Sequence, residues 1–319
     1  MTPYQEFIAK SRYARYLPEE ARREDWSETA QRWINFFKAQ YPQAPEWVWP
    51  ELQTAILNLD ALPSMRSVMT AGPALERTHV SAYNCSYLPV DHPRSFDEAM
   101  YILLCGTGVG FSVESQYVEQ LPVVPTLKSS KEVIFVEDSK EGWCYAFQDL
   151  LTSLWEGSIK KWDVSLVRPA GAPLKTFGGR ASGPGPLVDL FNYTIGKFKD
   201  AQGRKLGTVE CHDIMCKIGE VVVVGGVRRS AMISLGDLHD SEHATAKTGA
   251  WWEATPERAL ANNSAIYEDR PSREDFLNEW ATVKASGSGE RGIINRAALQ
   301  RQAARFGLRD TAVEYGTNP

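Results

Sequence analysis

The side chains best suited to redox or metal chemistry are five cysteines in a chain of 319 residues. They are Cys85, Cys105, Cys144, Cys211 and Cys216. The N-terminus lacks the apolar core of a signal peptide, so we do not expect a disulfide framework. Each cysteine is therefore a buried small residue, a ligand or a redox thiol.

Cys211, His212 and Cys216 have a helical spacing, which would let thiolates and an imidazole share a zinc ion. A structural zinc site needs four ligands, and no second Cys or His pair lies nearby. We predict that these residues lie buried on one face of a helix, and we predict no metal site.

Glycines at 106, 108 and 110 lie between a predicted helix and a predicted strand. A phosphate-binding loop needs the reverse order, strand then glycines then helix, so that the helix N-terminus faces the anion. No Gly-Lys-Ser/Thr follows either. We expect these glycines to allow close backbone approach to a ligand or to a neighbouring strand.

Two further loops carry cations. Residues 225–230 read Gly-Gly-Val-Arg-Arg-Ser, in which the arginines would contact a nucleotide or lie solvated in a surface turn. Residues 168–186 are rich in Gly and Pro and contain three cations, which suits a linker and a phosphate- or ribose-binding loop about equally well.

The elements that must position these residues alternate between helices and strands without a repeat, which indicates an α/β layer or barrel architecture. Ser95, Asp138 and Ser272 are expected helix caps. The expected strands are residues 80–88, 111–114, 133–136, 162–167, 221–224 and 231–235. The expected helices lie within 4–57 and at 96–104, 140–155, 187–199, 208–218, 273–286 and 293–306.

The composition excludes some classes of partner. A net charge of -5 and a pI of about 5.7 do not favour duplex nucleic acid or an anionic membrane. No apolar run reaches the roughly 20 residues of a membrane span. We therefore expect a cytoplasmic protein that binds neither a membrane nor duplex nucleic acid.

Several motifs in consistent order resemble the adenosylcobalamin-dependent (class II) ribonucleoside-triphosphate reductases. The similarity runs from the N-terminal helices to the last residue. The segments that carry it are residues 63–69, 84–86, 106–113, 174–179, 225–231 and 262–264.

The resemblance implies a fold. It predicts the first half of a ten-stranded α/β barrel at residues 61–319, preceded by an N-terminal helical region at 1–60. In the family a finger loop carries an Asn-Pro-Cys-x-Glu motif, whose Cys becomes the thiyl radical. Asn318 and Pro319 look like its opening, so we expect an N-terminal fragment completed by a C-terminal half, through a split gene or a split intein.

The resemblance also implies roles for individual residues. Cys85 matches the cysteine that, with a partner thiol, supplies two electrons to the radical intermediate, and Asn318 would orient the 3' hydroxyl. Candidate substrate-binding residues are Ser64, Asn84, Gly108 and Gly110. Candidate contacts with the deoxynucleotide effector, in the specificity loop, are Gly225, Gly226, Arg228, Arg229 and Ser230.

The function implied is reduction of ribonucleotides to deoxyribonucleotides, with adenosylcobalamin in the completed enzyme and a thioredoxin-type reductant. We expect the lone chain to be inactive. The alternative is a non-catalytic nucleotide-binding or assembly module related to the reductase. The resemblance assigns no cobalamin-binding residue.

Overall fold

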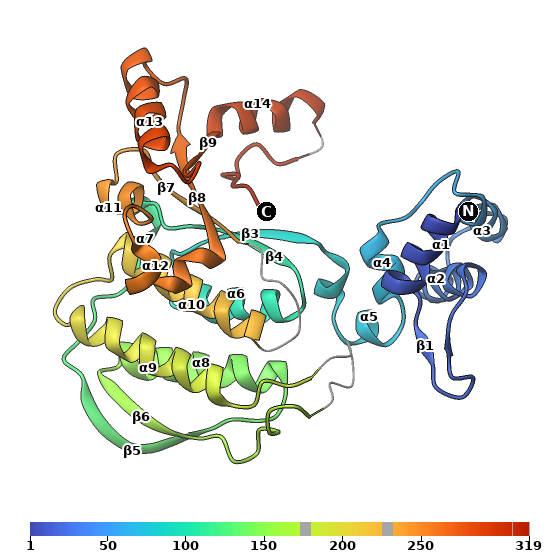
Figure 1. Ribbon diagram of the computed structural model, residues 1–319, viewed down its shortest axis with the longest axis horizontal. Coiled ribbons are helices and arrows are strands. Elements are labelled where there is room, and N and C mark those ends of the chain that lie inside the picture. Colours follow the sequence, from blue (N-terminus) through green and yellow to red (C-terminus); the bar gives the residue numbers. More distant parts are fainter. Residues whose placement is uncertain (173–179, 225–231, 308, 319) are drawn as a thin grey trace. The chain divides into compact units, whose positions relative to one another are not determined.

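The computed structural model describes residues 1–172, 180–224, 232–307 and 309–318 (Figure 1). These residues form two compact units, Met1–Asn84 and Cys85–Pro319. Each unit has its own secondary structure. Among the described residues, no helix is long and apolar enough to cross a membrane.

The first unit is helical apart from one small hairpin. Its central helix α2 begins with a capping box, in which Asp25 and Glu28 satisfy each other's backbone N–H groups. Ile34 of α2 packs with Trp49 and Ile56 of α3. The elements are α1 (Pro3–Ile8), η1 (Ala9–Tyr13), β1 (Tyr16–Leu17), β2 (Arg22–Arg23), α2 (Trp26–Gln40), α3 (Val48–Asn58), α4 (Met65–Thr70), α5 (Pro73–Arg77) and η2 (His79–Ala82).

This unit ends later than the boundary at residue 60 that the sequence predicts. The Arg32 guanidinium donates hydrogen bonds to the Val68 and Ala71 carbonyls, and the Trp33 indole donates to the Ser67 hydroxyl. These bonds join α4 to α2, so residues 61–84 group with the N-terminal helices.

The second unit is built on a five-stranded sheet in which every pair of neighbours is parallel. The strands follow the chain in the order β3-β4-β7-β8-β9. They are β3 (Cys85–Pro89), β4 (Gly108–Ser112), β7 (Met232–Asp237), β8 (Ala261–Tyr267) and β9 (Gly292–Asn295). Parallel neighbours need crossover connections, and helices supply them here.

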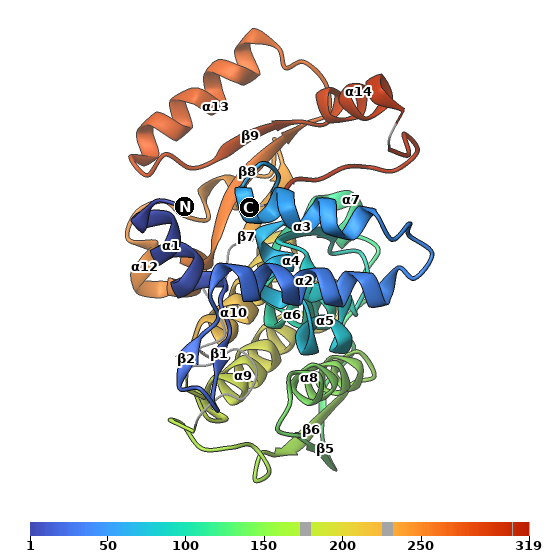
Figure 2. The ribbon, with the colours of Figure 1, turned by 90° about the vertical axis from the view of Figure 1, so that its right-hand side faces the viewer.

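The crossover helices are α6 (Ser95–Leu104), α7 (Ser115–Val118), α9 (Gly185–Asp200), α10 (Thr208–Val224), α11 (Ser241–Thr245), α12 (Trp251–Ala254), η3 (Pro256–Leu260) and α13 (Arg273–Ser286). Helix α14 (Arg296–Phe306) follows the last strand. Figure 2 shows α13 and α14 beside the β8–β9 side of the sheet.

Between β4 and β7 the chain forms a separate β-α-β motif. Strands β5 (Lys128–Phe135) and β6 (Ser158–Asp163) pair in parallel, and α8 (Lys140–Trp155) connects them. Figures 1 and 2 show this pair on the far side of α8 and α9 from the five-stranded sheet. Phe147 of α8 stacks with Phe191 of α9, which joins the motif to the main core.

One predicted strand is wrong. Residues 221–224 are the last turn of α10, although four consecutive valines favour a strand. Val221 and Val222 are buried in the same core as Ile214 and Ile218 from the preceding turns. Continued burial on one helix face outweighs the weak strand preference of β-branched side chains.

Other boundaries also differ from prediction. Residues 293–295 belong to β9, and α14 begins only after the Asn295 cap. Strand β8 was not predicted, because its first five residues, Ala-Asn-Asn-Ser-Ala, carry little strand signal. Ser139, not Asp138, caps α8, while Asp138 pairs with Arg168 instead.

Further differences involve short segments. Residues 80–82 lie in the 3-10 helix η2, and 164–167 follow β6 outside any strand. Ser95 is the first residue of α6, and the N-cap position is Arg94. The Ser272 cap of α13 is confirmed, since its hydroxyl accepts from the Asp275 N–H.

Candidate functional site

The register of β3 and β4 brings three predicted site residues together. Cys85 is the partner of Gly108, and Tyr87 is the partner of Gly110. Side chains alternate between the faces of a strand, so Cys85 and Tyr87 project from the same face. Gly108 and Gly110 leave the neighbouring strand bare on that face, which we call the Cys85 face.

The opposite face is the core face. Leu88, Val109 and Phe111 point there and pack in the main hydrophobic cluster. Helices α6 and α10 supply further apolar side chains to the same cluster, including Met100 and Ile214. The core therefore fixes which way the two strands face, and a slip of one residue would bury Cys85.

Cys85 differs from the other four cysteines in its exposure. Its thiol is exposed, whereas Cys105, Cys144, Cys211 and Cys216 are buried. Burial raises the pKa of Cys144 and of Cys211, which suppresses the reactive thiolate. Only Cys85 combines accessibility with a place on an open strand face.

The segment from Glu314 to Asn318 lies against the Cys85 face. A Cβ atom on Gly110 would overlap the Thr317 carbonyl oxygen, and would lie 2.8 Å from the Thr317 carbonyl carbon and 3.1 Å from the Asn318 Cα. A Cβ on Gly316 would overlap the Tyr87 ring. The backbone of Asn318 thus lies beside Gly110, two positions along β4 from the partner of Cys85.

A buried ion pair lies just beyond the end of β4. The Arg296 guanidinium donates to Glu114 over 2.5 Å, and Glu114 also accepts from the Ser112 hydroxyl over 2.6 Å. Arg296 is 2% exposed and Glu114 is 1% exposed. Arg296 also donates to Glu268, so one guanidinium ties β4 to the region after β8.

Two tyrosines complete this region. Burial raises the pKa of Tyr87 to about 12 and also raises the pKa of Tyr117. The Tyr117 hydroxyl donates to the Glu314 carboxylate, so both phenols stay neutral. Sequence reasoning missed Tyr87, Tyr117, Glu114 and Arg296. The available signal was a carboxylate directly after a buried strand.

The other predicted site residues lie in the first unit or outside the described residues. Ser64 and Asn84 belong to the first unit, where the Ser64 carbonyl accepts from Ser67 and Asn84 is the last residue. The predicted specificity-loop residues, Gly225 to Ser230, lie outside the described residues, as do 174–179.

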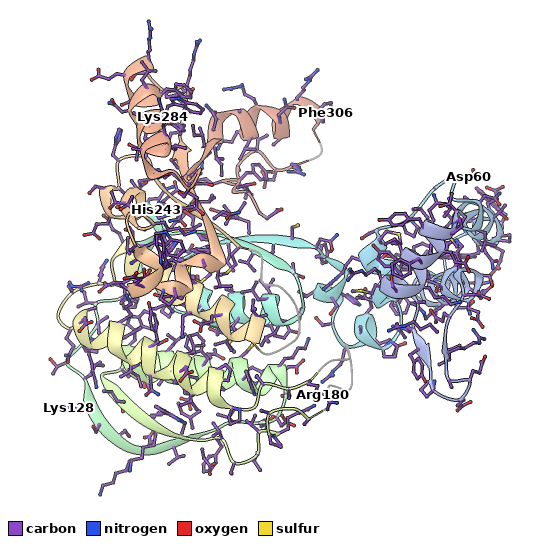
Figure 3. The ribbon with its side chains drawn as sticks, viewed as in Figure 1. Asp60, Lys128, Arg180, His243, Lys284 and Phe306 are labelled. Carbon is purple, nitrogen blue, oxygen red and sulfur yellow. The ribbon has the colours of Figure 1, made fainter. Side chains whose placement is uncertain are left out.

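His212 lies beneath the sheet on the core side. Its Nε2 atom is 3.1 Å from the Asn263 side-chain oxygen, and its Nδ1 atom is 3.3 Å from Asp213. Burial opposes protonation, but Cys216 and Asp213 together raise the pKa of His212 to about 10. His243, labelled in Figure 3, packs edge-on against this ring.

No metal cluster accompanies these residues. Among the residues that the structure describes, no group of three or more His, Cys, Asp or Glu side chains has the arrangement to hold a metal ion. Asp213 instead forms ion pairs with Arg258 at 2.7 Å and Lys197 at 2.7 Å. The network joins α10 to η3, to α9 and, through Asn263, to β8.

A cavity of about 770 Å³ lies at the other end of the sheet. It is lined at the carboxyl ends of β7 and β8 by acidic side chains, including Asp237, Glu268 and Asp275. Cys85 and Gly108 are at the amino ends of their strands, so this cavity is separate from the Cys85 face.

Comparison with known proteins agrees with this architecture. Residues 115–195 match the family model described as "B12-dependent ribonucleotide reductase, insertion domain". This range begins at α7, includes the β5-α8-β6 motif and ends within α9.

Relatives named adenosylcobalamin-dependent ribonucleoside-triphosphate reductase match almost the whole chain. The one from Levilactobacillus brevis is 28% identical over 97% of this chain and 51% of its own length. The one from Lacticaseibacillus paracasei is 30% identical over the same shares. The chain therefore spans about half the length of the curated relatives it matches.

A solved crystal structure of a B12-dependent (class II) ribonucleotide reductase has the same fold. It superposes with a TM-score of 0.78 at 24% identity, over 91% of this chain and 48% of the other. This confirms the predicted α/β fold. The resemblance seen in the motifs is also confirmed: almost the whole chain is similar in sequence to these reductases, and its fold is that of a class II ribonucleotide reductase.

Proposed function

We propose that this chain forms one half of an adenosylcobalamin-dependent ribonucleotide reductase, the half that carries a reducing thiol. The observation that supports it most is the place of Cys85. This exposed cysteine starts the first strand of a five-stranded parallel sheet, opposite a glycine, on the face where Asn318 also lies.

The reaction replaces the 2' hydroxyl of the ribose with hydrogen. Two thiols each give up one electron and one proton and become a disulfide, and the hydroxyl leaves as water. Cys85 is the first of these thiols. The second is not among Cys105, Cys144, Cys211 and Cys216, since burial makes all four inaccessible to a substrate.

The bare strand opposite Cys85 suits a nucleotide. Gly108 carries no side chain, so a ribose can approach the backbone of β4 close to the thiol. Asn318, whose backbone lies beside Gly110, would hydrogen-bond a 3' hydroxyl from the same face. The radical cysteine and the second thiol would come from the rest of the enzyme, as would the other half of the barrel.

The remaining partners follow from the relatives. We expect ribonucleoside triphosphates as substrates, a deoxynucleotide effector at Gly225, Gly226, Arg228, Arg229 and Ser230, and a thioredoxin-type reductant for the oxidised thiols. The reaction needs reduced thiols, which the cytoplasm maintains. Ser64 and Asn84 stay proposed substrate contacts.

Adenosylcobalamin would supply the radical when bound. Neither the family resemblance nor the geometry of the described residues identifies a side chain that would hold it. We therefore assign no cobalamin contact in the described part of this chain and derive no step through the cofactor.

An assay of the purified chain tests the proposal. The purified chain, given a ribonucleoside triphosphate, adenosylcobalamin and a dithiol, should form no deoxynucleotide. Clear turnover by the chain alone would contradict the assignment of the radical cysteine elsewhere.

The alternative is a non-catalytic nucleotide-binding module. Strands β3 and β9 are the outer strands of the described sheet, and their unpaired edges favour a chain that is covered by a partner. Calorimetry with deoxynucleoside triphosphates separates the two functions. Binding by the lone chain, with no gain of activity when the other half is added, would support the module.

A further inference from the structure

The glycine motif in β4 has a second feature that the proposed substrate wall does not explain. Among the glycines whose surroundings the structure describes, Gly110 is the one at which a Cβ atom would come closest to another part of the chain. The atoms that fill this space are the Thr317 carbonyl group and the Asn318 Cα. These atoms are backbone, so no rotamer change could make room for a Cβ there.

The same segment meets β3 one residue earlier. Gly316 passes against the Tyr87 ring so closely that a Cβ at 316 would overlap three ring atoms. Tyr87 and Gly110 are direct partners in the sheet. The Tyr87 ring on β3 and the missing side chain of Gly110 on β4 therefore form a recess that residues 316 and 317 occupy.

A third contact holds the start of the segment. The Tyr117 hydroxyl on α7 donates to the Glu314 carboxylate. Glu314 is exposed, whereas residues 315 to 317 are partly buried. A side-chain hydrogen bond thus holds the segment at Glu314, and close packing against β3 and β4 holds it at residues 316 and 317.

We propose that Tyr87 and Gly110 are positioning residues for Asn318, and that together with Tyr117 they form a seat for residues 314–318 on the Cys85 face. Gly110 then makes room for the backbone of Thr317, because it has no side chain. This role differs from lining the substrate-binding site. The role of the seat is to present Asn318 to a ribose, and this part of the inference rests on the proposed function.

The seat has a geometric consequence for the site. The segment covers Gly110, which lies two residues along β4 from Gly108, the partner of Cys85. The protein itself therefore fills the space beside Gly110, and the seat lies two positions from the thiol-bearing pair.

Hydrogen exchange of the backbone amides at 314–318 tests the seat in the chain alone, without nucleotide or cobalamin. Gly110→Ala should speed exchange there by about tenfold or more, because the segment must lift from β4. Gly196→Ala is the matched control, since its Cβ would meet nothing within 4 Å. Unchanged exchange at 314–318 in Gly110→Ala would overturn the proposal.

A second variant covers the case in which Gly110→Ala disrupts β4. Tyr117→Phe removes one hydroxyl from an exposed contact and should speed exchange at 314–318 by about three- to tenfold, with β3 and β4 unchanged. If Tyr117→Phe leaves the segment as protected as wild type, the seat is contradicted whatever happens to Gly110→Ala.

A double-variant cycle separates positioning from general stability. Gly316→Ala should speed exchange of the segment, because its new methyl group meets the Tyr87 ring. In Tyr87→Ala that ring is gone, so adding Gly316→Ala should change exchange by less than about twofold. Additive effects would contradict direct contact. Because exchange is read without turnover, failure of the seat and failure of the reductase assignment are distinguishable.

Discussion

Cys85 lies directly opposite Gly108 across the first two strands of the parallel sheet. One side of this pair is an exposed thiol and the other has no side chain at all. Val109 and Phe111 pack in the core and so fix the register of β4 and β3. The Cys85 thiol could turn toward the core only if a strand slipped by one residue. The pair therefore defines an open, thiol-bearing position on an otherwise rigid scaffold.

The first prediction concerns thiol reactivity. Ellman's reagent added to the native chain should modify one cysteine quickly and the other four only on unfolding. Cys85→Ser should abolish the fast phase, because Cys105, Cys144, Cys211 and Cys216 are buried. A fast phase that survives in Cys85→Ser would mean that a second cysteine is accessible.

The second prediction concerns the buried ion pair. Arg296→Met should lower the free energy of unfolding by about 3–5 kcal/mol, because Glu114 is left buried without its cation. Urea unfolding of the Cys85–Pro319 unit measures this loss.

Two variants control that measurement. Arg204→Met breaks an ion pair whose arginine is 51% exposed, and should cost no more than about 1 kcal/mol. Adding Glu114→Gln to Arg296→Met should recover part of the loss, since the uncompensated charge is removed. If Arg296→Met and Arg204→Met lowered the free energy of unfolding equally, the buried ion pair would contribute no more to stability than the exposed one.

The third prediction concerns pH. Burial raises the pKa of Asp97 to about 6, with only partial compensation from Arg94. The folded state therefore holds the proton more tightly than the unfolded state, whose pKa is about 4. The ionised carboxylate costs stability above pH 6, and this cost disappears as the pH falls from 6 to 4.

Asp97→Asn should accordingly stabilise the chain at pH 7, by at most about 3 kcal/mol, and by little at pH 4. Glu98→Gln is the control on the same helix, at a side chain that is 53% exposed. Urea unfolding at both pH values measures the difference. A stabilisation by Asp97→Asn that is the same at pH 7 and pH 4 would contradict the raised pKa.

Only part of the Cys85 face could be predicted from the sequence. The pattern predicts a strand through Cys85, but it places Gly108 and Gly110 in a loop before a strand at 111–114, whereas β4 spans Gly108–Ser112. The register of β3 and β4, which local sequence does not reveal, puts Cys85, Gly108 and Gly110 on one face. The burial of Cys211 and Cys216 on one helix face was predicted from local pattern, whereas the exposure of Cys85 is known only from the structure.

Contacts between distant residues could not be predicted. Tyr117 and Glu314 are 197 residues apart, and Arg296 and Glu114 are 182 apart. Nothing in either local sequence signals its partner. The valine run at 221–224 fails for a related reason: the side chains that bury it come from elements far away in the chain.

The most direct test of the central claim is turnover by Cys85→Ser in the assembled enzyme, made by combining the chain with the remaining half of a class II reductase. The account predicts that multiple turnover with a dithiol is lost while nucleotide affinity stays near that of the unsubstituted enzyme. Full turnover by Cys85→Ser, or loss of nucleotide binding in its place, would contradict the role of Cys85 as the reducing thiol.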